Sequence, residues 1–338
     1  MISPKCPIVI PTYKNRPDNI VQHLEKVSDN QIFVFCYKDD YENYKQYDCK
    51  KNVTFVQLDV PWRSIQKKRV VMQNYFIQRP EIERYIMIDD DMIGCRIQDT
   101  DGKAKNIPLS EGLSLLEKNH IKYCKTMSGG CYSSITMAHT NIDVKYNTRF
   151  LQVFCFENKW VIEHPECRFK DYQNMAEDLI IFFDALKNKQ QFCRFEKIRF
   201  TPIERKSHES LASSEDNLIK NFINGLRYMK EYSKPEISKY FTARRNKLSW
   251  CIDYQKDLII NEKYKPSIKP ILDKYMPGFE DLNNDYDIET FRKTFDEITN
   301  VLAKDFKYTK RKSDVEVFKP LMDEFNKVNG LSDFYEVN

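Results

Sequence analysis

Short apolar stretches separated by amphipathic ones make up the first part of the chain. Four apolar stretches have the length of buried β-strands: residues 7–11, 31–37, 53–58 and 85–88. Residues 19–27 and 64–76 lie between them with the spacing of helices, and Asp18 is in place to cap the first. This alternation of strands and helices predicts an α/β fold with a mostly parallel sheet.

The same pattern continues to about residue 212. It predicts a loop over residues 99–108, a helix over 109–123 with Ser110 as a possible cap, a strand over 152–156, a helix over 174–186 and a strand over 192–200. The Gly129-Gly130 pair indicates either a turn or a place where the backbone approaches a ligand closely.

The pattern of apolar and polar residues changes at residue 213. Amphipathic helical spacing then dominates, over residues 213–232, 289–306 and 315–328. We therefore expect one α/β domain over residues 1–212 and a largely helical accessory region over residues 213–338.

Three consecutive carboxylates, Asp89, Asp90 and Asp91, end the fourth apolar stretch. An unpaired buried carboxylate costs several kcal/mol, so these acids must meet solvent, cations or a metal. Asp89 and Asp91 are two residues apart, and in extended backbone their side chains point the same way. Such a pair suits a hard divalent cation that also holds a phosphorylated substrate. The alternative is a solvated acidic turn.

Polar residues follow the other predicted strands as well. Residues 12–16 follow the first strand, and Asp39 and Asp40 follow the second. Ligands of α/β sheets bind beyond the carboxyl ends of the strands. This convergence favours a cation site at Asp89–Asp91 over a solvated turn.

Composition narrows the class of protein. The 54 basic and 50 acidic residues give a net charge of +4, which is too small to indicate nucleic-acid binding by itself. No apolar run approaches the roughly 18 residues of a membrane span, and residues 1–10 lack the layout of a signal peptide. The ten cysteines are scattered without a Cys-x-x-Cys pair, so we expect neither a disulfide framework nor a zinc site. They indicate a reducing, cytoplasmic setting.

Four features occur in an order that resembles the nucleotide-sugar glycosyltransferases of the A-type fold. They are Pro-Thr-Tyr-Lys-Asn-Arg at residues 11–16, the Asp89–Asp91 triplet in place of an Asp-x-Asp motif, Glu177-Asp178 at a helix start, and His208 after the last strand. Residues 63–91, with a basic helix before the triplet, are similar to the TET/JBP-associated glycosyltransferases. The resemblance covers about residues 5–212.

This resemblance implies a Rossmann-like mixed, mostly parallel sheet and an enzyme that moves a hexosyl or pentosyl group. Its donor would be a UDP-sugar, with UDP-glucose the first choice. A Mn²⁺ or Mg²⁺ ion would be held by Asp89, Asp91 and His208 and would stabilise the diphosphate leaving group. Asp90 would face away from the metal, toward the donor sugar or an arginine.

The resemblance also implies a nucleotide pocket after the first strand. Thr12, Tyr13 and Arg16 would line it, with Tyr13 stacked on the base. Asp39 or Asp40 would accept the uracil N3–H, and an ordinary turn pair is the alternative. Arg69 would reach the diphosphate or the donor sugar; Arg63, Lys67 and Lys68 compete for that role, as does a solvated helix face.

Asp178 is the expected general base, beside Glu177. An inverting transfer needs a carboxylate that takes the acceptor hydroxyl proton on the face opposite the leaving group. Two acids that merely favour a helix N-terminus are the alternative. By resemblance the acceptor is a hydroxymethylated pyrimidine in double-stranded bacteriophage DNA, in the host cytoplasm. A glycan, lipid or protein acceptor, or a catalytically inactive binding protein, remain as alternatives. A nucleotidyltransferase is disfavoured, because residues 7–17 contain no glycine.

Overall fold

The computed structural model describes two compact units of the chain. The first comprises Met1–Asp171 and Glu177–Glu204, and the second Tyr172–Ala176 and Arg205–Asn338. The described residues are 6–12, 30–44, 52–58, 65–124, 128–133, 139–146, 152–170, 181, 184–185, 188, 190, 192–202, 265–279 and 286–305. Among the helices in these ranges, none is long and apolar enough to cross a membrane.

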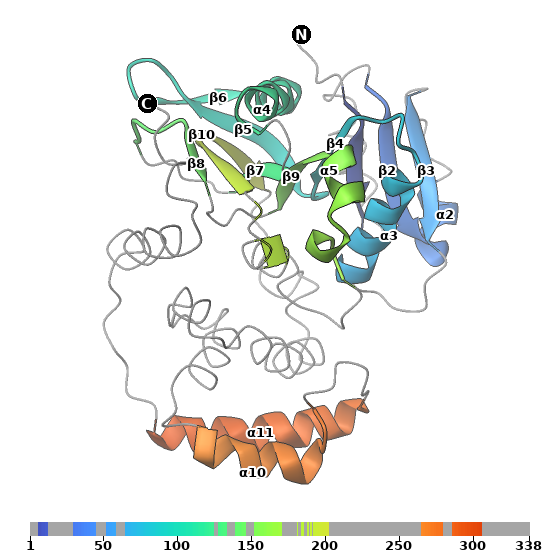
Figure 1. The fold of residues 1–338 in the computed structure, drawn as a ribbon, viewed down its shortest axis with the longest axis vertical. Helices are drawn as coiled ribbons and strands as arrows, with labels where there is room; N and C mark the ends of the chain where they lie inside the picture. The colour runs from blue at the N-terminus through green and yellow to red at the C-terminus, as the bar shows by residue number, and fades with distance from the viewer. Residues whose placement is uncertain are drawn as a thin grey trace. The chain divides into compact units, whose positions relative to one another are not determined.

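A mixed sheet of ten described strands forms the centre of the first unit (Figure 1). The strands are β1 (Ile8–Pro11), β2 (Ile32–Tyr37), β3 (Val53–Leu58), β4 (Arg84–Ile88), β5 (Met92–Gln98), β6 (Ala104–Ile107), β7 (Ser128–Ser133), β8 (Val144–Tyr146), β9 (Val153–Glu157) and β10 (Phe192–Pro202). Their order is β3-β2-β1-β4-β9-β7-β10-β5-β6, and β8 pairs with β10.

The half of the sheet that contains β1, β2, β3 and β4 is parallel. β1 lies between β2 and β4, with Ile8 in register with Ile32 on one side and with Ile86 on the other. All residues of β1 and β2 are buried, as continuous apolar runs predict for strands covered on both faces. The predicted α/β fold with its parallel-rich sheet is thus confirmed.

Helices cover both faces of this sheet. They are α2 (Lys38–Tyr44), α3 (Ile65–Ile77), α4 (Leu109–Tyr123) and α5 (Asn158–Glu163). On one face, Phe76 of α3 stacks on Tyr85 of β4, with ring centroids 4.3 Å apart. On the other, Gly112 of α4 lies so close to β5 that an added Cβ would be 2.5 Å from Cys95 Cβ. Glycine is therefore required at this helix–sheet contact.

Several elements differ from the sequence prediction. Residues 99–108 contain a strand, β6, because its exposed polar residues pair along the edge of the sheet with β5. The Gly129-Gly130 pair lies inside β7, between β9 and β10, rather than in a turn. Ser110 does not cap α4: Pro108 is the N-cap residue, and Ser110 is buried within the helix.

The structure describes seven of the ten cysteine side chains. Five of them are buried without a disulfide, namely Cys6, Cys36, Cys95, Cys155 and Cys167. Burial raises the pKa of Cys36, Cys95 and Cys167 to about 12, so these thiols are unreactive core residues. Cys124 and Cys193 form a disulfide, which the scattered spacing did not indicate, because the end of α4 and β10 meet only in the folded sheet.

β10 is irregular in its middle. It pairs with β8 through Cys193–Phe195 and with β5 through Ile198–Pro202. Along its other edge, its register against β7 shifts between Arg194 and Arg199. Along one edge, β10 therefore pairs first with β8 and then with β5.

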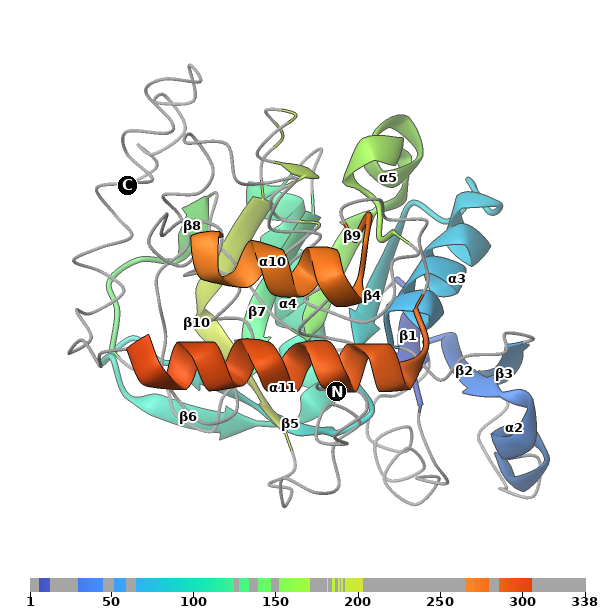
Figure 2. The ribbon, with the colours of Figure 1, turned by 90° about the horizontal axis from the view of Figure 1, so that it is seen from below.

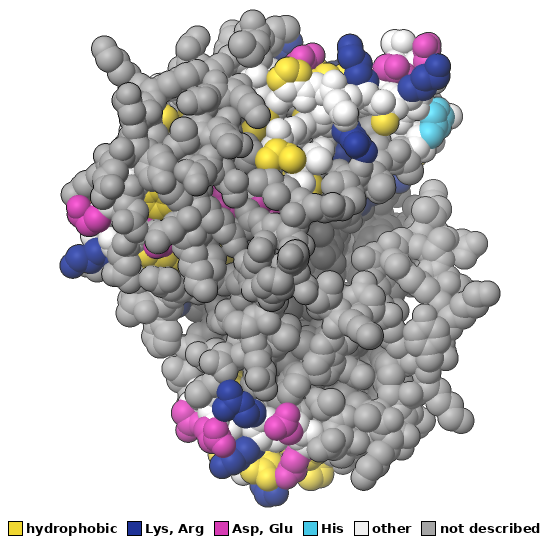
Figure 3. Space-filling view, turned by 180° about the vertical axis from the view of Figure 1, so that it is seen from behind, with side chains coloured by type: hydrophobic (Ala, Val, Ile, Leu, Met, Phe, Trp, Pro, Cys, Tyr) yellow, Lys and Arg dark blue, Asp and Glu magenta, His cyan; other side chains and the backbone are white. Residues whose placement is uncertain are grey.

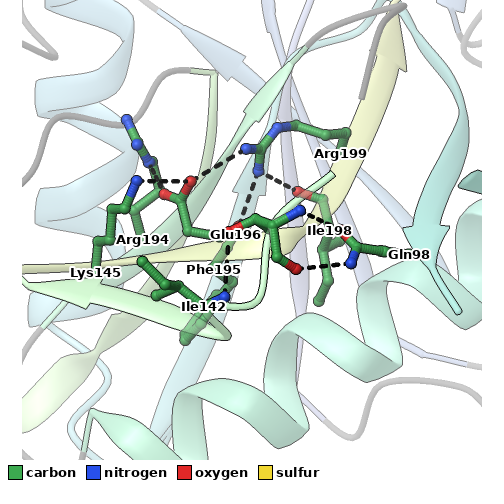
Figure 4. A network of polar contacts seen from close by, with 9 residues as sticks. Gln98, Ile142, Lys145, Arg194, Phe195, Glu196, Ile198 and Arg199 are labelled. Atoms are coloured by element: carbon green, nitrogen blue, oxygen red, sulfur yellow. Dashed lines mark hydrogen bonds and ion pairs between the residues drawn. The ribbon is translucent and has the colours of Figure 1, made fainter. Parts of the chain in front are cut away.

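Glu196 lies at this irregularity, surrounded by three cations (Figure 4). Its side chain is 6% exposed and forms ion pairs with Arg194, with Arg199 at 3.5 Å and with Lys145 of β8 at 3.6 Å. Arg199 Nη1 also donates to the carbonyls of Phe195 and Ile198. The cluster thus satisfies backbone groups that the register shift removes from the ladder.

Replacing Glu196 by glutamine is expected to destabilise the protein by about 3 kcal/mol at neutral pH and by less at acidic pH. Burial alone would raise the pKa of Glu196, but Arg194, Lys145 and Arg199 lower it below its ordinary value of 4.5. A carboxylate with such a lowered pKa stabilises the fold above the ordinary value and loses that contribution as the pH falls through the lowered one.

Urea unfolding of both proteins from neutral pH to about pH 3 measures this difference. Glu163→Gln is the control, because the ion pair of Glu163 with Lys159 lies on the exposed side of α5 and contributes little. A difference between wild type and Glu196→Gln that stays constant with pH would contradict the lowered pKa of Glu196.

The second unit contains two described helices, α10 (Lys265–Tyr275) and α11 (Ile288–Asp305), which lie side by side (Figure 2). The helix predicted over residues 289–306 is confirmed by α11, whereas α10 was missed because Pro270 interrupts its pattern. Basic and acidic side chains intermingle on the surface of this pair (Figure 3). The helices predicted over residues 213–232 and 315–328 lie outside the described residues.

Candidate active site

The carboxyl ends of three parallel strands bring the predicted site residues to one edge of the sheet. Thr12 follows β1, Asp40 lies in α2 directly after β2, and Asp89–Asp91 follow β4. Because β1 pairs in parallel with both β2 and β4, these three ends are neighbours. Ligand sites of α/β sheets form at such edges.

The acidic triplet forms a turn between β4 and β5. The Met92 N–H donates to the Asp89 carbonyl at 3.4 Å, and the Asp89 N–H donates to the carbonyl of Gln152 at 3.3 Å. The expectation of extended backbone from Asp89 to Asp91 is therefore wrong, because β5 leaves β4 to pair with β10. The acids are not equivalent: the Asp89 side chain is 19% exposed, Asp90 is buried and Asp91 is half-buried.

Arg69 of α3 reaches the triplet. Its Nη2 lies 2.8 Å from Asp89 Oδ1, and its side chain is only 3% exposed. The guanidinium lies over the rings of Phe154 and Phe169, at 5.0 and 5.8 Å from their centroids. This packing fixes the arginine head at the end of β4.

The helix face that carries Arg69 is anchored on both sides. Gln66 and Gln73 share this face by helical spacing. Gln66 Nε2 donates to the Lys170 carbonyl at 2.9 Å, and Gln73 Oε1 accepts from the Phe169 N–H at 2.8 Å. Each side chain thus holds the segment that follows α5 against α3.

Lys68 points to the first strand instead. Its Nζ donates to the Thr12 carbonyl and lies 4.1 Å from the ring centroid of Tyr37. The Thr12 hydroxyl forms a hydrogen bond with the hydroxyl of Tyr44, one helical turn after Asp40. Sequence reasoning misses Tyr44, because it places Asp39 and Asp40 after the second strand without the helix that residues 38–44 form.

The buried groups at the ends of β1 and β2 are close neighbours. Burial is the main cause of the raised pKa of Cys36, with Lys68 lowering it and Asp40 raising it. Thr12, Asp40 and Lys68 are all less than 5% exposed. These three residues therefore form a buried polar cluster beside the acidic turn.

The carboxylates of the turn suit a hard cation. Mg²⁺ and similar ions are commonly held by one or two protein carboxylates together with substrate phosphates. Asp89 and Asp91 supply oxygen ligands of this kind. Within the described ranges, no group of three or more His, Cys, Asp or Glu side chains could hold a metal alone. A complete site here needs the substrate or a further ligand, and His208 lies outside those ranges.

The remaining predicted site residues lie outside the described part of the chain. They are Tyr13, Arg16, Glu177 and Asp178, together with the competing Arg63 and the side chain of Asp39. The predicted helix over residues 174–186 is described at Ile181, Asp184 and Ala185, which are helical and buried. Asp184 forms an ion pair with Lys170 at 2.7 Å. The end of this helix is thus linked to the segment that packs on α3.

A known protein family matches this chain. The family model for TET-associated glycosyltransferases matches residues 6–207. No curated protein matches. Among solved structures, the crystal structure of GalNAc-T7 with UDP, GalNAc and Mn²⁺ aligns with a TM-score of 0.45 and 11% identity. The alignment covers 97% of this chain and 58% of that one, so the chain spans less than two thirds of its length.

Proposed function

The chain belongs to the family of TET-associated glycosyltransferases, and from this premise we propose that it transfers a sugar from a UDP-sugar to a hydroxymethylated pyrimidine in double-stranded DNA. Family membership confirms the expected enzyme class and the A-type fold. The donor, the metal and the acceptor are the proposal. We place the reaction in the cytoplasm of a bacteriophage-infected host.

The observation that carries the proposal is the acidic turn with its arginine. A sugar-nucleotide donor presents a diphosphate, which needs cations at the strand ends. Arg69 lies at Asp89 within the same edge, so a fixed positive charge and the carboxylates for a divalent cation occur together. Arg69 thereby has two tasks: it holds Asp89 and faces the donor diphosphate or sugar.

We assign Asp91 as the direct metal ligand, and Asp89 and His208 as the other metal ligands that the protein supplies. Arg69 forms an ion pair with one oxygen of Asp89, so Asp89 would meet the metal through its other oxygen, directly or through a metal-bound water. When bound, Mn²⁺ or Mg²⁺ neutralises the charge that grows on the departing diphosphate. Asp90, the most buried of the three acids, is assigned to the donor-sugar side.

The nucleotide would lie over the ends of β1 and β2. Thr12, Tyr13 and Arg16 are assigned to its pocket, with Tyr13 stacked on the uracil. Asp40, or Asp39 beside it, accepts the uracil N3–H. Lys68 and Tyr44 hold the Thr12 backbone and hydroxyl, so they keep the floor of this pocket in place.

Asp178 is assigned as the general base, with Glu177 beside it. As the acceptor oxygen bonds to the anomeric carbon, its proton passes to the Asp178 carboxylate. The bond from the anomeric carbon to the diphosphate oxygen breaks, and UDP leaves with the electron pair. Attack on the face opposite UDP inverts the anomeric configuration.

Incubation of the protein with Mn²⁺, UDP-glucose and DNA that contains hydroxymethylated pyrimidines tests the proposal. Transfer to this DNA, but not to matched unmodified DNA, is the expected result, measured by mass spectrometry of the nucleosides. A panel of other UDP-sugars defines the donor. Hydrolysis of UDP-sugar without transfer to DNA would exclude the DNA acceptor and favour a glycan, lipid or protein acceptor.

A further inference from the structure

Gln152 has an unusual backbone conformation. Its φ is 68°, in the left-handed region that residues with a Cβ rarely adopt. Across the described ranges it is the only residue other than glycine with positive φ, since the other two are Gly102 and Gly278. Such conformations persist where the surroundings impose them, and they cluster at functional sites.

Gln152 lies opposite Asp89. β4 and β9 are antiparallel, and Ile88 is in register with Val153. The next pair along the two strands is therefore Asp89 and Gln152, and the Asp89 N–H does donate to the Gln152 carbonyl at 3.3 Å. The unusual residue thus contacts the backbone of the acidic turn directly.

In a regular antiparallel ladder this pair would exchange two hydrogen bonds. Asp89 with Gln152 belongs to the hydrogen-bonded class of pair, as does Glu83 with Asn158 at the other end, where the Asn158 N–H donates to the Glu83 carbonyl at 2.8 Å. The rotation φ sets the direction of a residue's own N–H. A left-handed Gln152 therefore keeps its carbonyl in the ladder and turns its N–H away from Asp89.

The Asp89 carbonyl then serves the turn. It accepts the Met92 N–H at 3.4 Å, and this bond closes the four residues from Asp89 to Met92. An extended Gln152 would direct its N–H at the same carbonyl and continue the ladder into the acidic segment. The left-handed residue prevents this continuation of the ladder.

We propose that Gln152 is a positioning residue for the acidic turn. Its left-handed backbone ends the β4–β9 ladder at Asp89 and thereby holds Asp91 in the turn at the strand ends. This inference rests on the proposed function, because it assigns the turn to the cation and the diphosphate. Gln152 acts through Asp89 and does not touch the substrate.

Substitutions that differ in their tolerance of positive φ test the inference. Gln152→Gly and Gln152→Asn accept the left-handed conformation, whereas Gln152→Val resists it through its branched Cβ. We expect the valine protein to bind Mn²⁺ in the presence of UDP about tenfold more weakly, the size of effect typical of residues that orient metal ligands. The glycine and asparagine proteins should match wild type.

Hydrogen exchange supplies a readout that needs no metal and no activity. In the valine protein the Met92 amide should exchange faster, because the turn has lost its closing bond. Gln57→Val is the matched control: Gln57 is an exposed residue of β3, where valine is well tolerated, and both measurements should stay unchanged.

The outcomes separate this inference from the proposed function. A valine protein with wild-type Mn²⁺ affinity and wild-type exchange at Met92, even with a lower Tm, would overturn the positioning role. A glycine protein as weak as the valine one would also overturn it, since the side chain would then be what matters. If the Gln152→Val protein does not fold, Gln152→Ala takes its place in the test. The inference then requires that the Gln152→Ala protein bind Mn²⁺ more weakly than the glycine and asparagine proteins do. A wild-type protein that binds no Mn²⁺ with UDP would refute the proposed function itself.

Discussion

Replacing Asp91 by asparagine is expected to lower the rate of sugar transfer about a thousandfold, because it removes roughly 4 kcal/mol of stabilisation from the departing diphosphate. Asparagine keeps the size of the side chain but loses the negative charge that holds the cation. Asp91 is half-buried within the turn, so the substitution leaves the packing intact. The rate at saturating UDP-sugar and Mn²⁺ is the measurement.

Asp101→Asn provides the matched control for this loss. Asp101 is an exposed aspartate in the loop between β5 and β6, and its replacement should leave the rate unchanged. Titration of Mn²⁺ into each protein with UDP should show weaker binding for Asp91→Asn alone. Full metal-dependent activity of the Asp91→Asn protein would remove Asp91 from the metal site.

Replacing Arg69 by methionine is expected to destabilise the protein by about 4 kcal/mol and to abolish transfer. Arg69 is almost fully buried, and Asp89 is mostly so. Methionine still packs on Phe154 and Phe169, so the loss comes from the carboxylate left without its cation. Arg69→Lys should recover part of the stability, because lysine keeps the charge but not the planar stacking.

A double-mutant cycle separates the two tasks of Arg69. Adding Asp89→Asn to Arg69→Met removes the unpaired charge and should restore most of the lost free energy of unfolding. It should not restore transfer, because neither side chain is then present at the donor diphosphate. Recovered activity in the double variant would show that Arg69 serves only to hold the fold.

The parallel half of the fold could be predicted because its strands are buried on both faces. Burial on both faces produces continuous apolar runs, and these are visible in the sequence of β1 and β2. β6 was missed because it lies at the edge of the sheet and three of its four residues are exposed, so no hydrophobic period marks it.

The acidic residues of the candidate site could be predicted from the sequence, but the contacts that they form with other side chains could not. The Asp89–Asp91 triplet is conspicuous because charge follows an apolar run. Its partner Arg69 is one of several cations in the preceding segment, and only the direction of α3 across the sheet selects it. The bond between Thr12 and Tyr44 depends likewise on α2 bringing Tyr44 back to the residue that follows β1, which spacing alone does not reveal.

The change of neighbour along β10 has a consequence for the order of events during synthesis. β5 follows the acidic turn immediately, but it joins the main sheet only through β10, which leaves the ribosome much later. Until then, β5 and β6 have no partner strand in the main sheet, and the described contact that holds the downstream end of the turn is the packing of β5 against α4. The nascent chain therefore completes its parallel half first and acquires a functional turn only after β10 emerges. Chains that stop before residue 192 are expected to expose the unpaired edge of β5 and to aggregate.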